Sequence, residues 1–177
     1  AGEVNPSGRT CDLWATDLSA TPSFNNFGDH TYTDVIDYYT SIGSGAHFVE
    51  YAEGIYVGYR YYETAAAEAA AGNYPGFDYD AAVTFPFGFG LSYTSFKREL
   101  LDVTHEGEDL LAKVRVTNEG QVAGRDVAQL YATAPARRGV EKSAAVLVAF
   151  AKTDELAPGE SAELELRCCE RDLASWD

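Results

Sequence analysis

The second half of the chain alternates apolar and polar residues with a period of two. Residues 110–117 show this most clearly, with Leu110, Ala112, Val114 and Val116 alternating with Leu111, Lys113, Arg115 and Thr117. Residues 162–168 repeat the pattern. A period of two places successive side chains on opposite faces of a strand. With further strands expected at 100–105, 125–133 and 144–152, the pattern predicts a mainly β fold, an antiparallel β-sandwich.

Residues 1–95 lack this alternation. Residues 1–48 are rich in Gly, Pro, Asn, Ser and Asp, which indicates ordered loop. Within them, Asn5–Arg9 is a turn sequence, because Pro6 presets φ and Gly8 can take a positive φ. We therefore predict two domains, a loop-rich segment at 1–95 and a sandwich at 96–177.

The stretch from residue 51 to residue 93 is dense in aromatic residues. Aromatic and β-branched residues at 51–64 favour a strand or extended segment followed by a turn. Residues 65–71 are nearly all Ala and precede Gly72, which predicts a short helix that ends at this glycine. Pro86, Gly88 and Gly90 interrupt the next aromatic run, so 85–93 should be an irregular connector.

Composition narrows the function. The chain has 177 residues, 46% of them hydrophobic, and no apolar run approaches the ~18 residues of a membrane helix. Its formal net charge is -15, which argues against nucleic acid, because phosphate binding needs clustered Lys and Arg. We expect neither nucleic acid nor a membrane among its partners.

The cysteines form no recognisable framework. There are three, Cys11, Cys168 and Cys169, and the last two are neighbours that face opposite sides of any strand. Three cysteines, two of them adjacent in the sequence, do not form the pattern of a disulfide framework. The three His are not spaced in pairs with these cysteines as the ligands of a zinc site would be. We therefore expect no metal or cofactor, a core position for Cys168, and a reduced, cytoplasmic setting.

Two motifs carry a resemblance to a known family. The run Glu-Gly-Ile-Tyr-Val-Gly-Tyr-Arg-Tyr-Tyr-Glu (53–63) and the run Phe-Pro-Phe-Gly-Phe-Gly-Leu-Ser-Tyr (85–93) resemble the end of the second domain of family 3 glycoside hydrolases. Weaker landmarks follow the same order, at 2–9, 116–120, 129–131, 156–160 and 172–177. The chain is thus similar to the C-terminal part of such an enzyme, a remnant of an α/β sandwich domain followed by a fibronectin type III-like (immunoglobulin-like) domain.

The resemblance implies a parent enzyme, a retaining, exo-acting β-glucosidase that removes terminal β-D-glucosyl residues. Such an enzyme needs two carboxyl groups about 5 Å apart, a nucleophile and a general acid/base. The family carries both outside the part seen here. Ser175-Trp176-Asp177 has the wrong order for the nucleophile motif, and Glu53 matches the later run and not the acid/base loop. We expect no catalytic residue in this chain, which alone should be inactive.

The aromatic run supplies the candidate site residues. We predict that Glu53, Arg60 and Glu63 form an ion-pair or hydrogen-bond set that holds the junction between the domains. Tyr56, Tyr59 and Tyr61 could contact a sugar face on the aglycone side of the parent's active site, because apolar ring faces suit pyranose C–H surfaces.

Three functions are compatible with the sequence. The first is a non-catalytic scaffold in a glycoside hydrolase, with the parent's other domains and a β-glucoside or oligosaccharide as partners. The second is a stand-alone fibronectin type III-like module that binds carbohydrate or protein; the residues from Phe96 onward offer few aromatics for it. The third is a free-standing enzyme, for which no nucleophile and base arrangement is visible.

Two further expectations come from the family pattern. Members continue past the landmark at 172–177 into a final strand, and a sandwich without it leaves an open edge that invites self-association. The loop at 11–17 is similar to a bacterial subgroup in which the catalytic barrel follows the fibronectin-like domain in some members.

Overall fold

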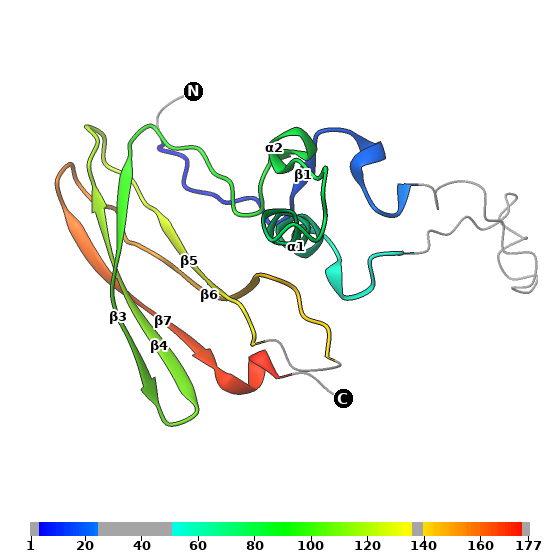
Figure 1. Ribbon diagram of the computed structural model, residues 1–177. Helices are drawn as coiled ribbons and strands as arrows, with labels where there is room; N and C mark the ends of the chain where they lie inside the picture. The colour runs from blue at the N-terminus through cyan, green and yellow to red at the C-terminus, as the bar shows by residue number, and fades with distance from the viewer. Residues whose placement is uncertain (1–3, 25–50, 136–139, 175–177) are drawn as a thin grey trace, which may run out of the picture. The chain divides into compact units, whose positions relative to one another are not determined.

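The computed structural model describes residues 4–24, 51–135 and 140–174 (Figure 1). The chain forms two compact units. The β-rich unit comprises residues 1–13 and 86–177, and the second unit comprises residues 14–85. These units are not the domains predicted from the sequence, and the boundary between residues 95 and 96 stays a prediction.

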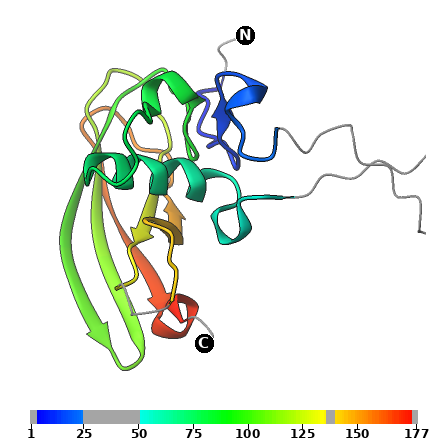
Figure 2. The same cartoon turned by 45° about the vertical axis from the view of Figure 1, so that its right-hand side comes forward.

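The β-rich unit contains two antiparallel sheets. Strands β3 (Phe96–Glu106), β4 (Asp109–Asn118) and β7 (Ser161–Cys169) form one sheet in the order β3-β4-β7. Strands β5 (Val127–Ala132) and β6 (Val146–Lys152) form the other, which packs on the first (Figures 1 and 2). All five predicted strands are present, and the predicted mainly β sandwich is confirmed.

Buried and exposed residues alternate along the strands that form the core of this unit, as the two-residue period of the sequence predicts. Ala112 and Val116 of β4 are fully buried, whereas Lys113 and Arg115 between them are exposed. Leu166 of β7 packs in the same cluster with Ala128 of β5 and Leu156, so the core joins both sheets. Cys168 is 2% exposed, which confirms its predicted core position.

Asn118 is the last residue of β4 and closes that end of the strand. Its side chain is completely buried, and its amide donates to the carbonyl oxygens of Val122 (2.8 Å) and Leu156 (2.9 Å). Its Oδ1 accepts hydrogen bonds from Thr94 Oγ1 (2.6 Å) and Gly120 N (3.1 Å). A buried amide with every group paired is stabilising, whereas an unpaired one would be costly.

The N-terminal segment packs on the β-rich unit through side chains. Asn5 donates to the carbonyl oxygen of Ala123 (3.0 Å) and accepts from Ser92 Oγ (3.0 Å) and Tyr93 N (2.9 Å). The prediction of a turn at 5–9 is wrong: these residues form no turn, and Gly8 has no positive φ. Contacts with distant residues fix the segment in place of a local hydrogen bond.

Glycine allows the closest approach in this region. A Cβ on Gly90 would lie 2.5 Å from the carbonyl oxygen of Gly8 and 2.9 Å from the guanidinium of Arg9. The aromatic connector and the N-terminal segment therefore lie backbone against backbone, joined by hydrogen bonds from Thr10 N to Phe89 O (2.8 Å) and from Gly88 N to Thr10 O (3.0 Å). The glycines of the Phe-Gly-Phe-Gly motif have a packing role here.

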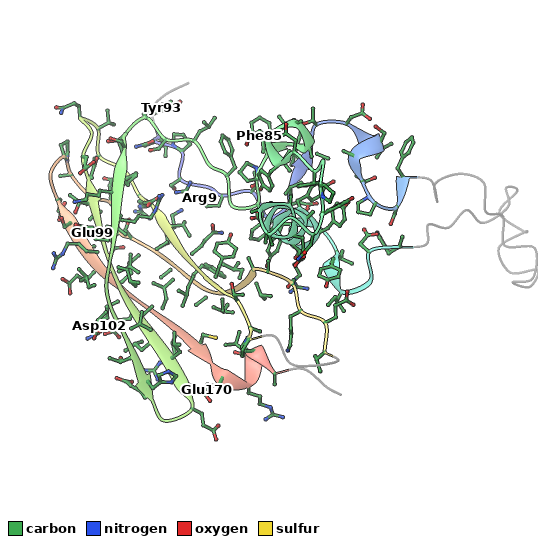
Figure 3. The ribbon with its side chains drawn as sticks, in the orientation of Figure 1. Arg9, Phe85, Tyr93, Glu99, Asp102 and Glu170 are labelled. Carbon is green, nitrogen blue, oxygen red and sulfur yellow. The ribbon has the colours of Figure 1, made fainter. Side chains whose placement is uncertain are left out.

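A buried carboxylate anchors the N-terminal segment. Asp126 is 2% exposed, and its Oδ1 accepts hydrogen bonds from Arg9 and, at 2.7 Å, from Arg98 Nη2 of β3. Arg98 Nε also lies 2.7 Å from Oδ2 without the alignment of a hydrogen bond, so this second contact is ionic. Arg9, labelled in Figure 3, and Arg98 thus share one negative charge.

The second unit is small and partly helical. Strands β1 (Trp14–Ala15) and β2 (Val83–Phe85) pair antiparallel at its ends, with the rings of Trp14 and Phe85 edge to face at 6.1 Å. Between them lie the 3-10 helices η1 (Leu18–Ala20) and η4 (Gly54–Tyr56) and the α-helices α1 (Tyr59–Ala70) and α2 (Tyr79–Ala82). A 3-10 helix, η5 (Glu170–Leu173), follows β7 in the other unit.

The prediction of a strand at 51–64 is wrong. This stretch contains η4 and the first half of α1, which begins after Gly58, a glycine with φ +67°. Tyr62 and Ala65 are buried at a spacing of three residues, so one helical face packs inward. Burial of that face overrides the strand preference of the tyrosines. No described helix is long and apolar enough to cross a membrane.

We expect Asp126→Asn to lower the free energy of unfolding by about 2 kcal/mol, because it removes the charge-assisted hydrogen bonds between this buried carboxylate and the partly exposed Arg9 and Arg98. Urea unfolding followed by circular dichroism measures the change. Asp102→Asn is the control, since Asp102 lies exposed on β3 (Figure 3) and should change the free energy by less than about 0.5 kcal/mol. Equal effects of the two substitutions would contradict a stabilising role for the Asp126 charge.

Candidate functional site

The second unit contains a hollow with an aromatic lining and a volume of about 240 Å³. The rings of Tyr56, Tyr61 and Tyr74 line it together with Glu68 and Asn73. Thr64 and Ala65 of α1 complete the lining. Mostly apolar walls with a few polar groups are the usual composition of a small-molecule site.

The end of α1 positions one side of the hollow. Gly72 has φ +82° and follows the helix, and its N–H donates to the carbonyl oxygen of Ala69 (3.0 Å). The N–H of Asn73 donates to the carbonyl oxygen of Glu68 (2.8 Å). This pair of bonds is a Schellman motif, for which glycine is the preferred residue at the left-handed position. The predicted glycine stop is confirmed, and it brings Asn73 and Tyr74 back beside Glu68.

Side chains then fix the polar groups. Asn73 Nδ2 donates to Glu68 Oε2 at 2.7 Å. The hydroxyls of Tyr61 and Tyr74 lie 3.4 Å apart. The ring of Tyr74 stacks on Phe77 at 5.7 Å, and Tyr61 meets the same Phe77 edge to face at 6.3 Å. Phe77 therefore holds both rings.

Burial perturbs one of these tyrosines. It raises the pKa of Tyr61 to about 12, and the hydrogen bond with Tyr74 adds to the shift. Tyr61 is thus a neutral hydroxyl throughout the physiological range, able to donate and to accept a hydrogen bond but not to act as a phenolate base.

The six predicted residues lie at different places in this unit. Tyr56 and Tyr61 line the hollow, whereas Tyr59 is not among its lining residues and lies 6.0 Å from the guanidinium carbon of Arg60. Their contact with a sugar stays a prediction. Tyr74, Glu68 and Asn73 were missed, although the glycine stop after the alanine run was a signal that the chain turns back there.

The predicted junction set has separate partners in the described part of the chain. Glu53 accepts a hydrogen bond from Ser23 Oγ, and Glu63 accepts one from Tyr79 at 2.7 Å. Arg60 Nε is buried and has no hydrogen-bond partner among the described residues. Within those residues no group of three His, Cys, Asp or Glu converges as metal ligands would.

Comparison with known proteins supplies the family. The profile of the fibronectin type III-like domain matches residues 126–177. Over 99% of its length the chain is 36% identical to a β-glucosidase of Ruminococcus albus and 37% identical to β-glucosidase A of Butyrivibrio fibrisolvens. The chain is thus similar to one part of these longer β-glucosidases. The predicted resemblance is confirmed.

Solved structures of β-glucosidases show the same similarity. The crystal structure of a β-glucosidase from Paenibacillus barengoltzii matches 99% of the chain with 38% identity and a TM-score of 0.74. β-Glucosidase 3B from Thermotoga neapolitana in complex with glucose matches with 37% identity and a TM-score of 0.72. The chain spans only 15% and 20% of the two curated relatives and 16% and 21% of these two structures.

We expect the second unit to lose stability as pH rises from about 10 to about 12. The folded state holds the Tyr61 proton up to about pH 12, whereas an unfolded tyrosine releases it near pH 10, so the unfolded state gains in this window. Below about pH 10 the ionisation of Tyr61 does not change the stability of the fold. Tyr61→Phe should flatten the fall in a melting curve recorded against pH, and Tyr51→Phe, at a tyrosine 68% exposed, should not. Parallel curves for the wild type and Tyr61→Phe would refute this.

Proposed function

We propose that the chain is a non-catalytic part of a retaining, exo-acting β-glucosidase and serves it as a structural scaffold. The observation that carries this proposal is the alignment of 99% of the chain with β-glucosidases of which it covers only 15–20%. The parent would hydrolyse terminal β-D-glucosyl residues with two carboxyl groups that lie elsewhere in its sequence. Its other domains and a β-glucoside or oligosaccharide are then the partners.

A scaffold role suits the strongest interactions of the β-rich unit. Asn118, Asp126 and Asn5 are engaged with neighbouring protein groups and hold loops in place. On the described strands of this unit the large exposed aromatics are Tyr131 and Phe150, too few for the flat aromatic row expected of a carbohydrate-binding sandwich. These features support a scaffold over a stand-alone binding module.

A cytoplasmic location, suggested by the three free cysteines, stays a prediction.

The second unit would contribute to the aglycone side of the parent's active site. Tyr56 and Tyr61 line a hollow that has room for a small ligand, and Tyr59 adds a third ring on the first turn of α1. Glu53, Arg60 and Glu63 would brace this segment, since Glu53 and Glu63 accept hydrogen bonds from Ser23 and Tyr79.

In the intact parent we expect Tyr61→Ala to raise KM for substrates with a long or bulky aglycone by about tenfold, which corresponds to about 1.4 kcal/mol of lost binding, with kcat nearly unchanged. KM for a small aglycone should stay the same. Tyr51→Ala is the matched control.

The chain alone should not hydrolyse nitrophenyl β-glucoside above the buffer rate. An equal KM change for small and large aglycones would contradict the aglycone-side role, and turnover by the chain alone would contradict the non-catalytic one.

The sheet edges support self-association of the chain as part of this proposal. In the described residues β5 and β6 pair only with each other, and Phe150 on β6 is 70% exposed. Unpaired strand edges with exposed apolar side chains favour pairing between chains. We expect the chain to dimerise at high concentration in light scattering and Phe150→Lys to shift it to monomer. Leu91→Lys, at a residue equally exposed but outside the strands, should leave the dimer intact. A monomeric wild type would rule this out.

A further inference from the structure

The hollow at the end of α1 combines two kinds of surface that a sugar needs. Tyr61 and Tyr74 supply aromatic walls, and Glu68 and Asn73 supply hydrogen-bonding groups on one side. A pyranose presents C–H groups on its faces and hydroxyls around its rim, so it matches walls of this kind. The hollow, of about 240 Å³, lies below the range of about 300–1,000 Å³ of drug-sized sites. A single monosaccharide unit suits that size.

The polar groups retain capacity for a ligand. Oε2 of Glu68 accepts the hydrogen bond from Asn73, and its other oxygen has none among the hydrogen bonds of the described residues. An ionised carboxylate accepts several hydrogen bonds, and the Asn73 side chain still has its carbonyl oxygen. Glu68, Asn73 and Tyr74 are all exposed. Vicinal sugar hydroxyls could donate to the first two while the ring packs on the third.

The backbone holds these groups in place before a ligand arrives. The carbonyl oxygen of Glu68 accepts the N–H of both Asn73 (2.8 Å) and Tyr74 (3.2 Å). Phe77 stacks on Tyr74, which fixes the ring that would face the sugar. A site whose groups are already ordered loses less entropy on binding than a flexible one.

We infer that this hollow, formed by Tyr61, Tyr74, Glu68 and Asn73, is a binding site for one pyranose unit, which the chain binds without the parent's catalytic centre. The ligand class, a β-glucoside or a short β-linked oligosaccharide, rests on the proposed function. The site adds three residues, Tyr74, Glu68 and Asn73, that sequence analysis did not predict to contact sugar.

The test is a titration of the chain with methyl β-D-glucopyranoside and with cellobiose, followed by NMR. Both should bind with a Kd on the order of millimolar, with resonance changes at residues 61–74. Mannitol, a polyol without a ring face, should not saturate.

Tyr74→Ala should weaken binding at least tenfold. Glu68→Ala, an exposed helical position where alanine keeps the helix, should weaken it about fivefold. Tyr93→Ala, at an exposed tyrosine of the other unit, is the control and should bind like the wild type.

Three results would overturn the inference: no saturable binding of either sugar, equal binding of mannitol, or wild-type affinity in Tyr74→Ala with its spectrum still that of a folded chain. Each leaves the proposed function standing, because the parent's hydrolysis and the aglycone effect on KM are measured in the intact enzyme. Conversely, an inactive parent with normal sugar binding by the chain would remove the proposed function and leave this site.

Discussion

The organisation of the β-rich unit depends on the pairing of one buried carboxylate with two arginines. Asp126 lies just before β5, Arg98 lies on β3 in the other sheet, and Arg9 belongs to a segment with no regular structure. An unpaired charge at a site 2% exposed would be strongly destabilising, so the two sheets and the segment must come together for the carboxylate to be tolerated. The apolar core cluster between the sheets provides the larger burial, but a hydrophobic core is not directional. The ion pairs add a directional constraint that the core lacks.

The aromatic stretch from residue 51 to residue 93 has two separate roles in this arrangement. Its last part, with Gly88 and Gly90, packs backbone against backbone on the N-terminal segment within the β-rich unit. Its first part forms η4 and α1 in the other unit, where tyrosines line a hollow. A motif that identifies a family can therefore combine packing positions and candidate ligand contacts within a few tens of residues.

Sequence reasoning succeeded where the physics is local or periodic. The alternation at 110–117 and 162–168 identified β4 and β7, and Gly72 identified the end of α1. It failed where distant residues decide. The sequence did not predict the start of α1, because tyrosines taken alone favour strands. The helix forms because one of its faces, which includes Tyr62, is buried. The contact of Arg9 with Asp126 joins residues 117 positions apart, which no local pattern encodes.

The pairing of β1 with β2 brings the two ends of the second unit together, since Trp14 lies opposite Phe85. That unit is thus an insertion within the β-rich unit, entered after Leu13 and left before Pro86. A single proteolytic cut inside residues 14–85 would leave the first thirteen residues attached noncovalently through Asn5 and Arg9. Replacing the whole insertion by a short linker would preserve the continuity of the sandwich, because Thr10 already lies within hydrogen-bonding distance (3.1 Å) of the carbonyl oxygen of Pro86. The sandwich therefore closes across residues 10 and 86 through its own contacts and does not need the inserted unit for this closure.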